Sequence, residues 1–139
     1  MSGTLREAVL GAWELVSFVA RDAATGEDRH PLGTAPIGLI LYTVDGHKSA
    51  QLADSGMKGY ISYGGRFSVD EETSTLRHHV TMSMMPELLT QVQFRHAGIH
   101  GEILTLSATR TDDAGMTTHS RLQWKRSAPT PNHPPASTA

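Results

Sequence analysis

Residues 59–84 read GYISYGGRFSVDEETSTLRHHVTMSM, and this stretch predicts a β-hairpin around which the rest of the chain is organised. The first arm, Tyr60–Val69, is rich in aromatic and β-branched residues, which favour strands. Asp70–Ser74 is a polar connector of the length that joins antiparallel strands. The second arm, Thr75–Met84, alternates between apolar and polar residues, as a strand with one buried face does.

The second arm places one imidazole on an otherwise apolar face. Because strand side chains alternate with a period of two, one face carries Leu76, His78, Val80, Met82 and Met84, and the other carries Thr75, Arg77, His79, Thr81 and Ser83. A titratable group in an apolar row is the strongest functional indication in the sequence. The alternative is a structural histidine, buried with its nitrogens satisfied. The side chains of His78 and His79 diverge, so this pair does not chelate one metal.

Length and composition exclude several classes of protein. A chain of 139 residues suits one domain with a hydrophobic core. Charged residues make up 19% and the net charge is −2, which argues against a nucleic-acid-binding surface. Cysteine is absent, which excludes disulfides and thiol chemistry and agrees with a cytoplasmic location. We find no signal peptide, no apolar run of the roughly 20 residues that span a membrane, and no nucleotide-binding fingerprint.

The rest of the sequence predicts short strands and one helix. Thr4 and Glu7 form the pattern of a capping box, which predicts a short helix over about Leu5–Leu10. Asp45-Gly46 is a strong signal for a hairpin turn. The other predicted strands are Gly11–Arg21, Ile37–Val44, His47–Leu52, Thr90–Ala97, Glu102–Arg110 and Met116–Arg126.

Such a series of hairpins predicts an all-β fold of about eight or nine strands with one short N-terminal helix. Closure into a single antiparallel up-and-down β-barrel removes the exposed edge strands, and a barrel of about eight strands is wide enough for one small ligand. We assign residues 1–126 to this barrel domain. Residues 127–139 are rich in Pro and Ser and predict a disordered tail.

Several segments, taken in order, resemble those of lipocalin-like β-barrels of the calycin type. Lipocalins open with Gly-x-Trp, which Gly11-Ala12-Trp13 matches, and they place a basic residue of the last strand against that Trp, a role open to Arg121 or Arg126. The closer resemblance, over about residues 8 to 126, is to the small bacterial and fungal lipocalin-like domain proteins. The matching segments are Gly11–Ser17, Pro36–Gly38, Tyr42–Gly46, Tyr63–Phe67, His78–Val80, Gln93–Arg95, Leu104–Leu106 and Trp124–Arg126.

This resemblance implies a barrel with an internal cavity. Some members lie in natural-product pathways, where small barrels act as cofactor-free cyclases or isomerases. Relatives usually carry a longer, partly helical insertion at the position of Ala53–Lys58, and here it is nearly absent. If that insertion covers the cavity, the cavity of this chain is more open and excludes water less well.

The two faces of strand 90–97 compete for the lumen. Burial alone favours Val92, Phe94 and His96. The resemblance favours the face that carries Gln93 and Arg95, because calycin barrels meet a polar ligand group with an interior arginine. For Arg95 the alternative is an exposed strand residue, or one in a surface ion pair of little energetic value.

If His78 and Arg95 both enter the lumen, the site suits proton transfer next to a carbonyl group. His78 moves a proton near neutral pH, and Arg95 holds a carboxylate, enolate or phenolate. Tyr63 or Tyr42 donates a hydrogen bond to a developing oxyanion. We therefore predict His78, Arg95 and Tyr63 as catalytic residues. The predicted ligand-binding residues are Tyr42, Phe67, Val80, Met82, Met84, Gln93, Leu106 and Trp124.

The predicted function is that of a cofactor-free enzyme that isomerises, dehydrates or cyclises a small hydrophobic substrate, polyketide- or terpenoid-like, by acid/base chemistry. The alternatives are a non-catalytic binder or carrier of a small hydrophobic molecule and, less favoured by His78, a protein-interaction barrel with a filled core. A metal site at His96 and His100 is disfavoured, because Gly98 and Gly101 predict a turn. We expect no cofactor, no metal, no nucleic-acid or membrane partner, and a monomer or homodimer.

Overall fold

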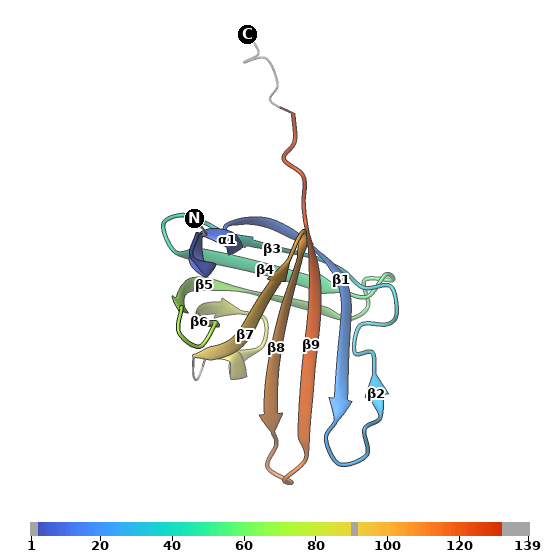
Figure 1. Cartoon of the computed structure of the whole chain (residues 1–139). Coiled ribbons are helices and arrows are strands. Elements are labelled where there is room, and N and C mark those ends of the chain that lie inside the picture. The colour runs from blue at the N-terminus through green and yellow to red at the C-terminus, as the bar shows by residue number, and fades with distance from the viewer. Residues whose placement is uncertain (1–2, 90–91, 132–139) are drawn as a thin grey trace.

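The computed structural model describes residues 3–89 and 92–131, whose regular structure is mostly β-strand (Figure 1). A short helix, α1 (Leu5–Val9), precedes the strands, and a 3-10 turn, η1 (Pro86–Leu89), follows the sixth strand. The strands are β1 (Gly11–Asp22), β2 (Asp28–Arg29), β3 (Ile37–Tyr42), β4 (His47–Ala53), β5 (Tyr60–Asp70), β6 (Thr75–Ser83), β7 (Gln93–His100), β8 (Ile103–Thr111) and β9 (Thr117–Arg126).

The strands close into a barrel. From β3 to β9 each strand pairs antiparallel with the next, and β1 pairs with β3 on one side and with β9 on the other. The pairing of β1 with β9 runs from Asp22 opposite Thr118 to Trp13 opposite Arg126. Over the described residues the result is a closed, antiparallel, up-and-down barrel of eight strands, with β2 as an extra strand beside β1. This confirms the predicted fold class.

The helix α1 covers one end of the barrel. The predicted capping box is present, because the Thr4 hydroxyl accepts the Glu7 amide and the Glu7 carboxylate accepts the Thr4 amide. The Glu71 carboxylate, in the turn between β5 and β6, accepts two further amides from the start of α1 at 2.8 and 3.1 Å. Arg6 donates to the Val44 carbonyl oxygen in the turn between β3 and β4. We call this the closed end, and the opposite one the far end.

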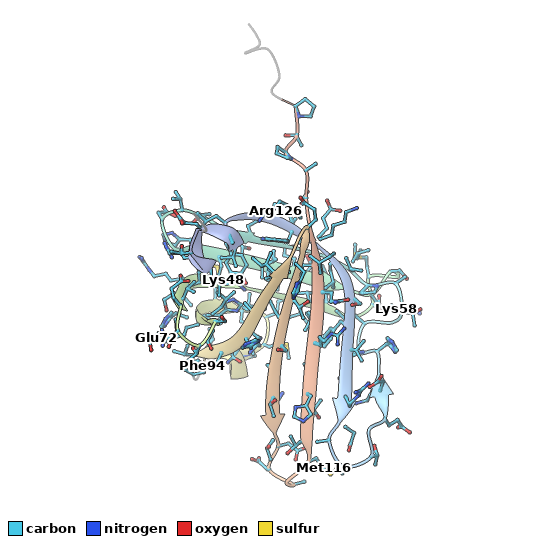
Figure 2. The ribbon with its side chains drawn as sticks, in the orientation of Figure 1. Lys48, Lys58, Glu72, Phe94, Met116 and Arg126 are labelled. Atoms are coloured by element: carbon cyan, nitrogen blue, oxygen red, sulfur yellow. The ribbon has the colours of Figure 1, made fainter. Side chains whose placement is uncertain are left out.

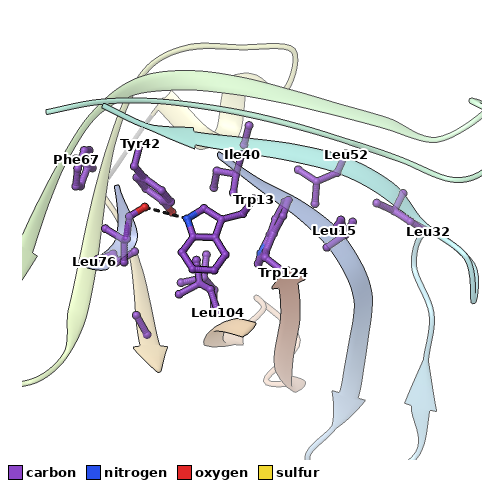
Figure 3. Close-up of a cluster of buried hydrophobic side chains, with 14 residues drawn as sticks. Trp13, Leu15, Leu32, Ile40, Tyr42, Leu52, Phe67, Leu76, Leu104 and Trp124 are labelled. Carbon is purple, nitrogen blue, oxygen red and sulfur yellow. Dashed lines mark hydrogen bonds between the residues drawn. The ribbon is translucent and has the colours of Figure 1, made fainter. Parts of the chain in front are cut away.

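Two tryptophans and an arginine form the core near the closed end. Trp13 and Trp124 belong to one buried cluster, and the Trp13 indole donates to the Val9 carbonyl oxygen at 2.9 Å, the dashed line of Figure 3. The Arg126 guanidinium lies 4.0 Å from the Trp13 ring centroid and donates to two carbonyl oxygens at the end of α1. The sequence left the partner of Trp13 open, and the structure selects Arg126, since Arg121 is exposed.

The strand boundaries differ most from prediction at β7. This strand runs from Gln93 to His100, whereas the prediction was a strand over residues 90–97 followed by a turn. Thr90 and Gln91 lie outside the described residues. Gly98 remains extended because it pairs with Thr105 of β8, so the chain reverses only after His100.

The predicted tail is tied to the barrel through its first residue. The Ser127 amide donates to the Ala12 carbonyl oxygen, and its hydroxyl donates to the Glu14 carboxylate at 2.8 Å. Residues 128–131 have no regular secondary structure, and positions 132–139 lie outside the described residues. Disorder of the tail therefore stays a prediction. Within the described ranges no helix is long and apolar enough to cross a bilayer.

A β-bulge in β6 changes which side chains face the lumen. Gly65 of β5 pairs with Val80, but Gly64 pairs with Met82, so β6 contains one extra residue between the two pairs. A Cβ atom on Gly65 would lie 2.1 Å from the His79 carbonyl oxygen, and glycine is therefore required for this close approach. Beyond the bulge, the inward and outward positions of β6 are exchanged.

Candidate functional site

Polar side chains from neighbouring strands meet inside the barrel. They are Tyr42 on β3, Lys48 on β4, Tyr63 on β5, His78 on β6 and Arg95 on β7. Tyr42, Lys48 and His78 are only 1, 3 and 0% exposed, and Tyr42 pairs directly with Lys48 across β3 and β4. Lys48 Nζ lies 3.6 Å from the Tyr63 ring centroid, and the His78 ring lies 5.8 Å from the Tyr42 ring and 6.2 Å from the Tyr63 ring, measured between centroids. We call this group the interior polar cluster.

A buried hydrogen bond joins Tyr42 to His78. The Tyr42 hydroxyl oxygen and His78 Nε2 are 2.9 Å apart, and the Phe67 ring packs edge-on against Tyr42 at a centroid distance of 4.9 Å. His78 Nδ1 is buried and has no hydrogen-bond partner within the described part of the chain. As the strand alternation predicts, His78 faces inward and His79 faces outward, where its Nε2 lies 3.4 Å from the Ser68 hydroxyl.

Burial sets the protonation of the cluster. It lowers the pKa of His78 well below the ordinary value of 6.5, and the positive charges of Lys48 and Arg95 lower it further. Burial also raises the pKa of Tyr42 well above 10.0. Burial raises the pKa of Tyr63 as well, although the charge of Arg95 and its hydrogen bond to Tyr63 act to lower that pKa. The imidazole and both phenols are therefore uncharged near neutral pH, and His78 retains a basic lone pair.

The structure decides between the two faces of β7. Phe94 is 56% exposed and lies outside, whereas Ala97 is buried and Arg95 is half-buried. Arg95 pairs with the buried Leu76, and Gln93 pairs with His78, so both share the inward face that the resemblance favours. The Arg95 guanidinium donates to its neighbouring Phe94 carbonyl oxygen at 2.9 Å and exerts its charge on the interior polar cluster.

Lys48 is the member of the cluster that the sequence analysis missed. Its Nζ atom lies 3.6 Å from the centroid of the Tyr63 ring and has no hydrogen-bond partner among the residues described. Burial, followed by the charge of Arg95, lowers the pKa of Lys48 well below the ordinary value of 10.5. A signal was present in the sequence, because Lys48 shares the alternating face of Ala50 and Leu52, both of which are buried.

The other predicted ligand-binding residues divide into two groups. Those on the inner side are Phe67, Val80, Gln93, Leu106 and Trp124. Phe67, Leu106 and Trp124 belong to the buried core cluster, whereas Val80 and Gln93 are half-buried. A role for any of them in binding a ligand stays a prediction.

The prediction that Met82 and Met84 line the cavity is wrong. Their side chains are 67% and 60% exposed. The cause is the extra residue at the bulge, which puts Met82 opposite the outward-facing Gly64 and brings Ser83 opposite Tyr63. Uninterrupted alternation, on which the prediction relied, holds only as far as Val80.

The cluster contains cations and hydrogen-bond donors but no carboxylate. Within residues 3–89 and 92–131, the buried polar or charged side chains are Lys48 and His78, and no Asp or Glu acts on the pKa of either. The same ranges hold no group of three or more His, Cys, Asp or Glu that is able to bind a metal ion. His96 and His100 lie on the exposed face of β7.

Two hollows on the molecular surface lie outside the barrel. One crosses the outer faces of β6 to β9 near Phe94 and His96, and the other crosses those of β4 to β6 near Met82. Tyr42, Tyr63, His78 and Arg95 line neither of them, whereas Lys48 is among the residues that line the second. We take the interior polar cluster as the candidate site, because it brings buried polar side chains of several strands together.

Comparison with known protein families adds one finding. The model of the lipocalin-like domain family matches residues 10–59 and 53–127. The two matched segments overlap at residues 53–59, in the connector between β4 and β5. No curated protein matches the chain.

Proposed function

The chain belongs to the lipocalin-like domain family, whose barrel suits a small hydrophobic ligand, and on that premise we propose that the lumen binds a small hydrophobic molecule that carries an acidic or carbonyl oxygen. One observation carries the proposal. The interior polar cluster offers Lys48, Arg95 and two phenols to a ligand, and no carboxylate among the described residues neutralises it.

An acidic ligand supplies a negative charge to pair with the cationic groups of the interior. A buried cation without a partner is costly, and Lys48 avoids this cost by releasing its proton more readily. A carboxylic acid, phenol or enol that enters beside Nζ returns the proton and leaves an ion pair. Arg95 adds the planar, always-charged donor that suits a carboxylate or enolate.

The walls of the lumen suit the apolar part of such a ligand. Phe67, Leu76 and Leu106 lie beside the cluster. Towards the far end, small side chains face inward in a row across three strands, where Ala108 pairs with Ser120 and Ser120 pairs with Ala20. Small side chains fill less of the lumen, so we assign the ligand's apolar part to this half.

Titration with a fluorescent polyene acid tests this function. cis-Parinaric acid is compared with its methyl ester, which has the same chain but no ionisable group. We expect the acid to bind more tightly than the ester, and Arg95→Gln to weaken the acid about 10-fold or more while leaving the ester unchanged. Arg121→Gln, on the outer face, serves as the matched control. Equal affinity for acid and ester, or binding of neither, contradicts the proposal.

A second candidate, supported by the geometry of His78, is cofactor-free proton transfer in an isomerase- or cyclase-type reaction. Tyr42 holds the imidazole through Nε2, which leaves Nδ1 without a described protein partner and available to a ligand. Neutral His78 then accepts the proton next to a carbonyl, while Arg95 and the Tyr63 hydroxyl stabilise the enolate. A polyketide- or terpenoid-like ketone is the substrate class that fits the apolar walls.

Deuterium exchange separates catalysis from binding. 2-Tetralone, an apolar ketone with exchangeable α-protons, is incubated in deuterated buffer and followed by proton NMR. If the protein is an enzyme, exchange exceeds the buffer rate, and His78→Gln lowers it about 10²–10⁴-fold with ligand affinity retained. The exposed His79→Gln serves as the control. If the exchange rate equals that in buffer, or if both variants lower it equally, His78 does not catalyse proton transfer and the function is ligand binding alone.

A further inference from the structure

Lys48 is a buried amine in the middle of the candidate site, and no described acidic residue pairs with it. Its side chain is 3% exposed, and Nζ forms no hydrogen bond within the described ranges. Figure 2 shows Lys48 within the outline of the barrel, whereas Lys58 projects from its periphery. The chain's other lysine, Lys125, is also exposed. The chain thus has one buried lysine and two exposed ones.

The strand register gives the Lys48 side chain room and neighbours. Its partner on β5 is Gly65, which has no side chain, and its partner on β3 is Tyr42. The Nζ atom lies over the Tyr63 ring at 3.6 Å from the centroid. His78, across the lumen on β6, is within range of its charge. Nζ therefore points into the part of the lumen to which the proposed function assigns the ligand's oxygen.

We propose that Lys48 forms an imine with an aldehyde group of a hydrophobic ligand in the lumen. The inference rests on the proposed function, because the ligand must first enter the barrel, and it deepens that function by naming the reactive group. No described residue forms a hydrogen bond or ion pair with Nζ, so its lone pair is free to attack a carbonyl carbon. Burial and the charge of Arg95, which lower the pKa of Lys48, favour the uncharged amine that this attack needs.

The amine and the aldehyde are the only reactants, and water is the only by-product. The lone pair of Nζ forms a bond to the carbonyl carbon, and the carbon–oxygen π electrons move to oxygen. One amine hydrogen transfers to that oxygen to give the carbinolamine. The carbon–oxygen bond then breaks, the second amine hydrogen leaves with it as water, and nitrogen completes the double bond to carbon. No oxidant or reductant is required, and the face of the Tyr63 ring stabilises the iminium if the imine is protonated.

Reductive trapping tests this proposal on the wild-type protein. All-trans-retinal is the probe aldehyde, retinol is the matched alcohol, and sodium cyanoborohydride reduces any imine to a stable amine. We expect intact-protein mass spectrometry to show one adduct with retinal and none with retinol. Peptide mapping is expected to place the adduct on Lys48. The test needs no variant, so its result does not depend on the folding of a mutant.

Two variants sharpen the assignment. Lys48→Met, which keeps the length of the side chain without the amine, is expected to lose the adduct. The double variant Lys58→Arg/Lys125→Arg removes the exposed amines and is expected to keep the full yield. An adduct on Lys58 or Lys125 at a yield equal to that on Lys48 overturns the inference.

The failure of the imine and the failure of ligand binding give different results. If retinal quenches the tryptophan fluorescence but no adduct forms on Lys48, the inference is wrong and hydrophobic binding stands. If retinal, retinol and parinaric acid all leave the fluorescence unchanged, both the imine and the proposed function are wrong.

Discussion

The Tyr42 hydroxyl lies 2.9 Å from His78 Nε2 in the interior of the barrel, although 36 residues separate the two in the sequence. The contact joins β3 to β6 across the lumen, since these strands are not neighbours in the sheet. Each of these buried polar groups depends on the other, because neither the phenol nor Nε2 has another described partner. The hydrogen bond therefore fixes the orientation of the imidazole.

We expect strong energetic coupling between Tyr42 and His78. Tyr42→Phe leaves Nε2 unpaired and His78→Leu leaves the phenol unpaired, so each is expected to lower the free energy of unfolding by about 1–3 kcal/mol. The double variant is expected to lose clearly less than the sum, because no unpaired group remains. The free energies come from urea unfolding of the four proteins.

The pair of Ser68 and His79 on the outer face is the control for this cycle. Its atoms are 3.4 Å apart and exposed, so Ser68→Ala and His79→Ala are expected to add without coupling and to change stability by less than about 0.5 kcal/mol each. Additive losses at Tyr42 and His78 would show that the buried hydrogen bond does not form.

Gly65 is expected to tolerate no side chain. Gly65→Ala puts a Cβ atom 2.1 Å from the His79 carbonyl oxygen, so the bulge must shift at a cost of about 1–3 kcal/mol or more. Gly98→Ala is the matched strand control, because nothing lies within 4 Å of its added Cβ atom, and its stability should be unchanged or slightly higher. Thermal unfolding compares the two, and equal melting temperatures would contradict the bulge.

Arg126 is expected to stabilise the closed end. Arg126→Gln removes the cation from the Trp13 ring and two hydrogen bonds to carbonyl oxygens at the end of α1. We expect a loss of about 1–3 kcal/mol and a changed tryptophan emission spectrum. Arg121→Gln, at the exposed alternative position on β9, should change neither. Equal effects of the two variants would show that Arg126 does not lie against the Trp13 ring.

Lys48 is expected to make the stability rise with pH. Its pKa in the folded protein is well below 10.5, the ordinary value expected for the unfolded chain. Between these two values the unfolded chain holds one more proton than the folded protein, so the free energy of unfolding increases as pH increases. The groups that face Lys48 are Tyr42, Tyr63, His78 and Arg95, and the tyrosines, whose pKa values are raised, stay neutral up to about pH 10.

Lys48→Met tests this dependence. The variant carries no amine in the interior, so it should be more stable than the wild type near pH 7, and its stability should rise less steeply as the pH rises towards 10.5. Urea unfolding at several pH values gives both slopes. Identical slopes would mean that Lys48 holds its proton in the folded state, which also removes the nucleophile needed for the imine.

The sequence by itself determined the features that arise within one strand or one turn. The alternation from Leu76 to Val80 placed His78 inward and His79 outward, and Thr4 with Glu7 identified the capping box. The succession of hairpins predicted a closed barrel. These features follow from local geometry, because a period of two residues and a fixed turn length depend only on neighbouring positions.

The tertiary structure decided everything that depends on how distant strands pair. The bulge, which requires Gly65 to pass close to His79, turned Met82 and Met84 outward, and the register of β9 selected Arg126 over Arg121. The register of β4 with β3 and β5 likewise made Tyr42 and Gly65 the neighbours of Lys48, whose inward direction the alternation within β4 indicates. The pattern within a single strand does not reveal where a bulge lies. One extra residue exchanges the inward and outward positions of the rest of the strand, and the pairing with the partner strand decides where that extra residue is placed.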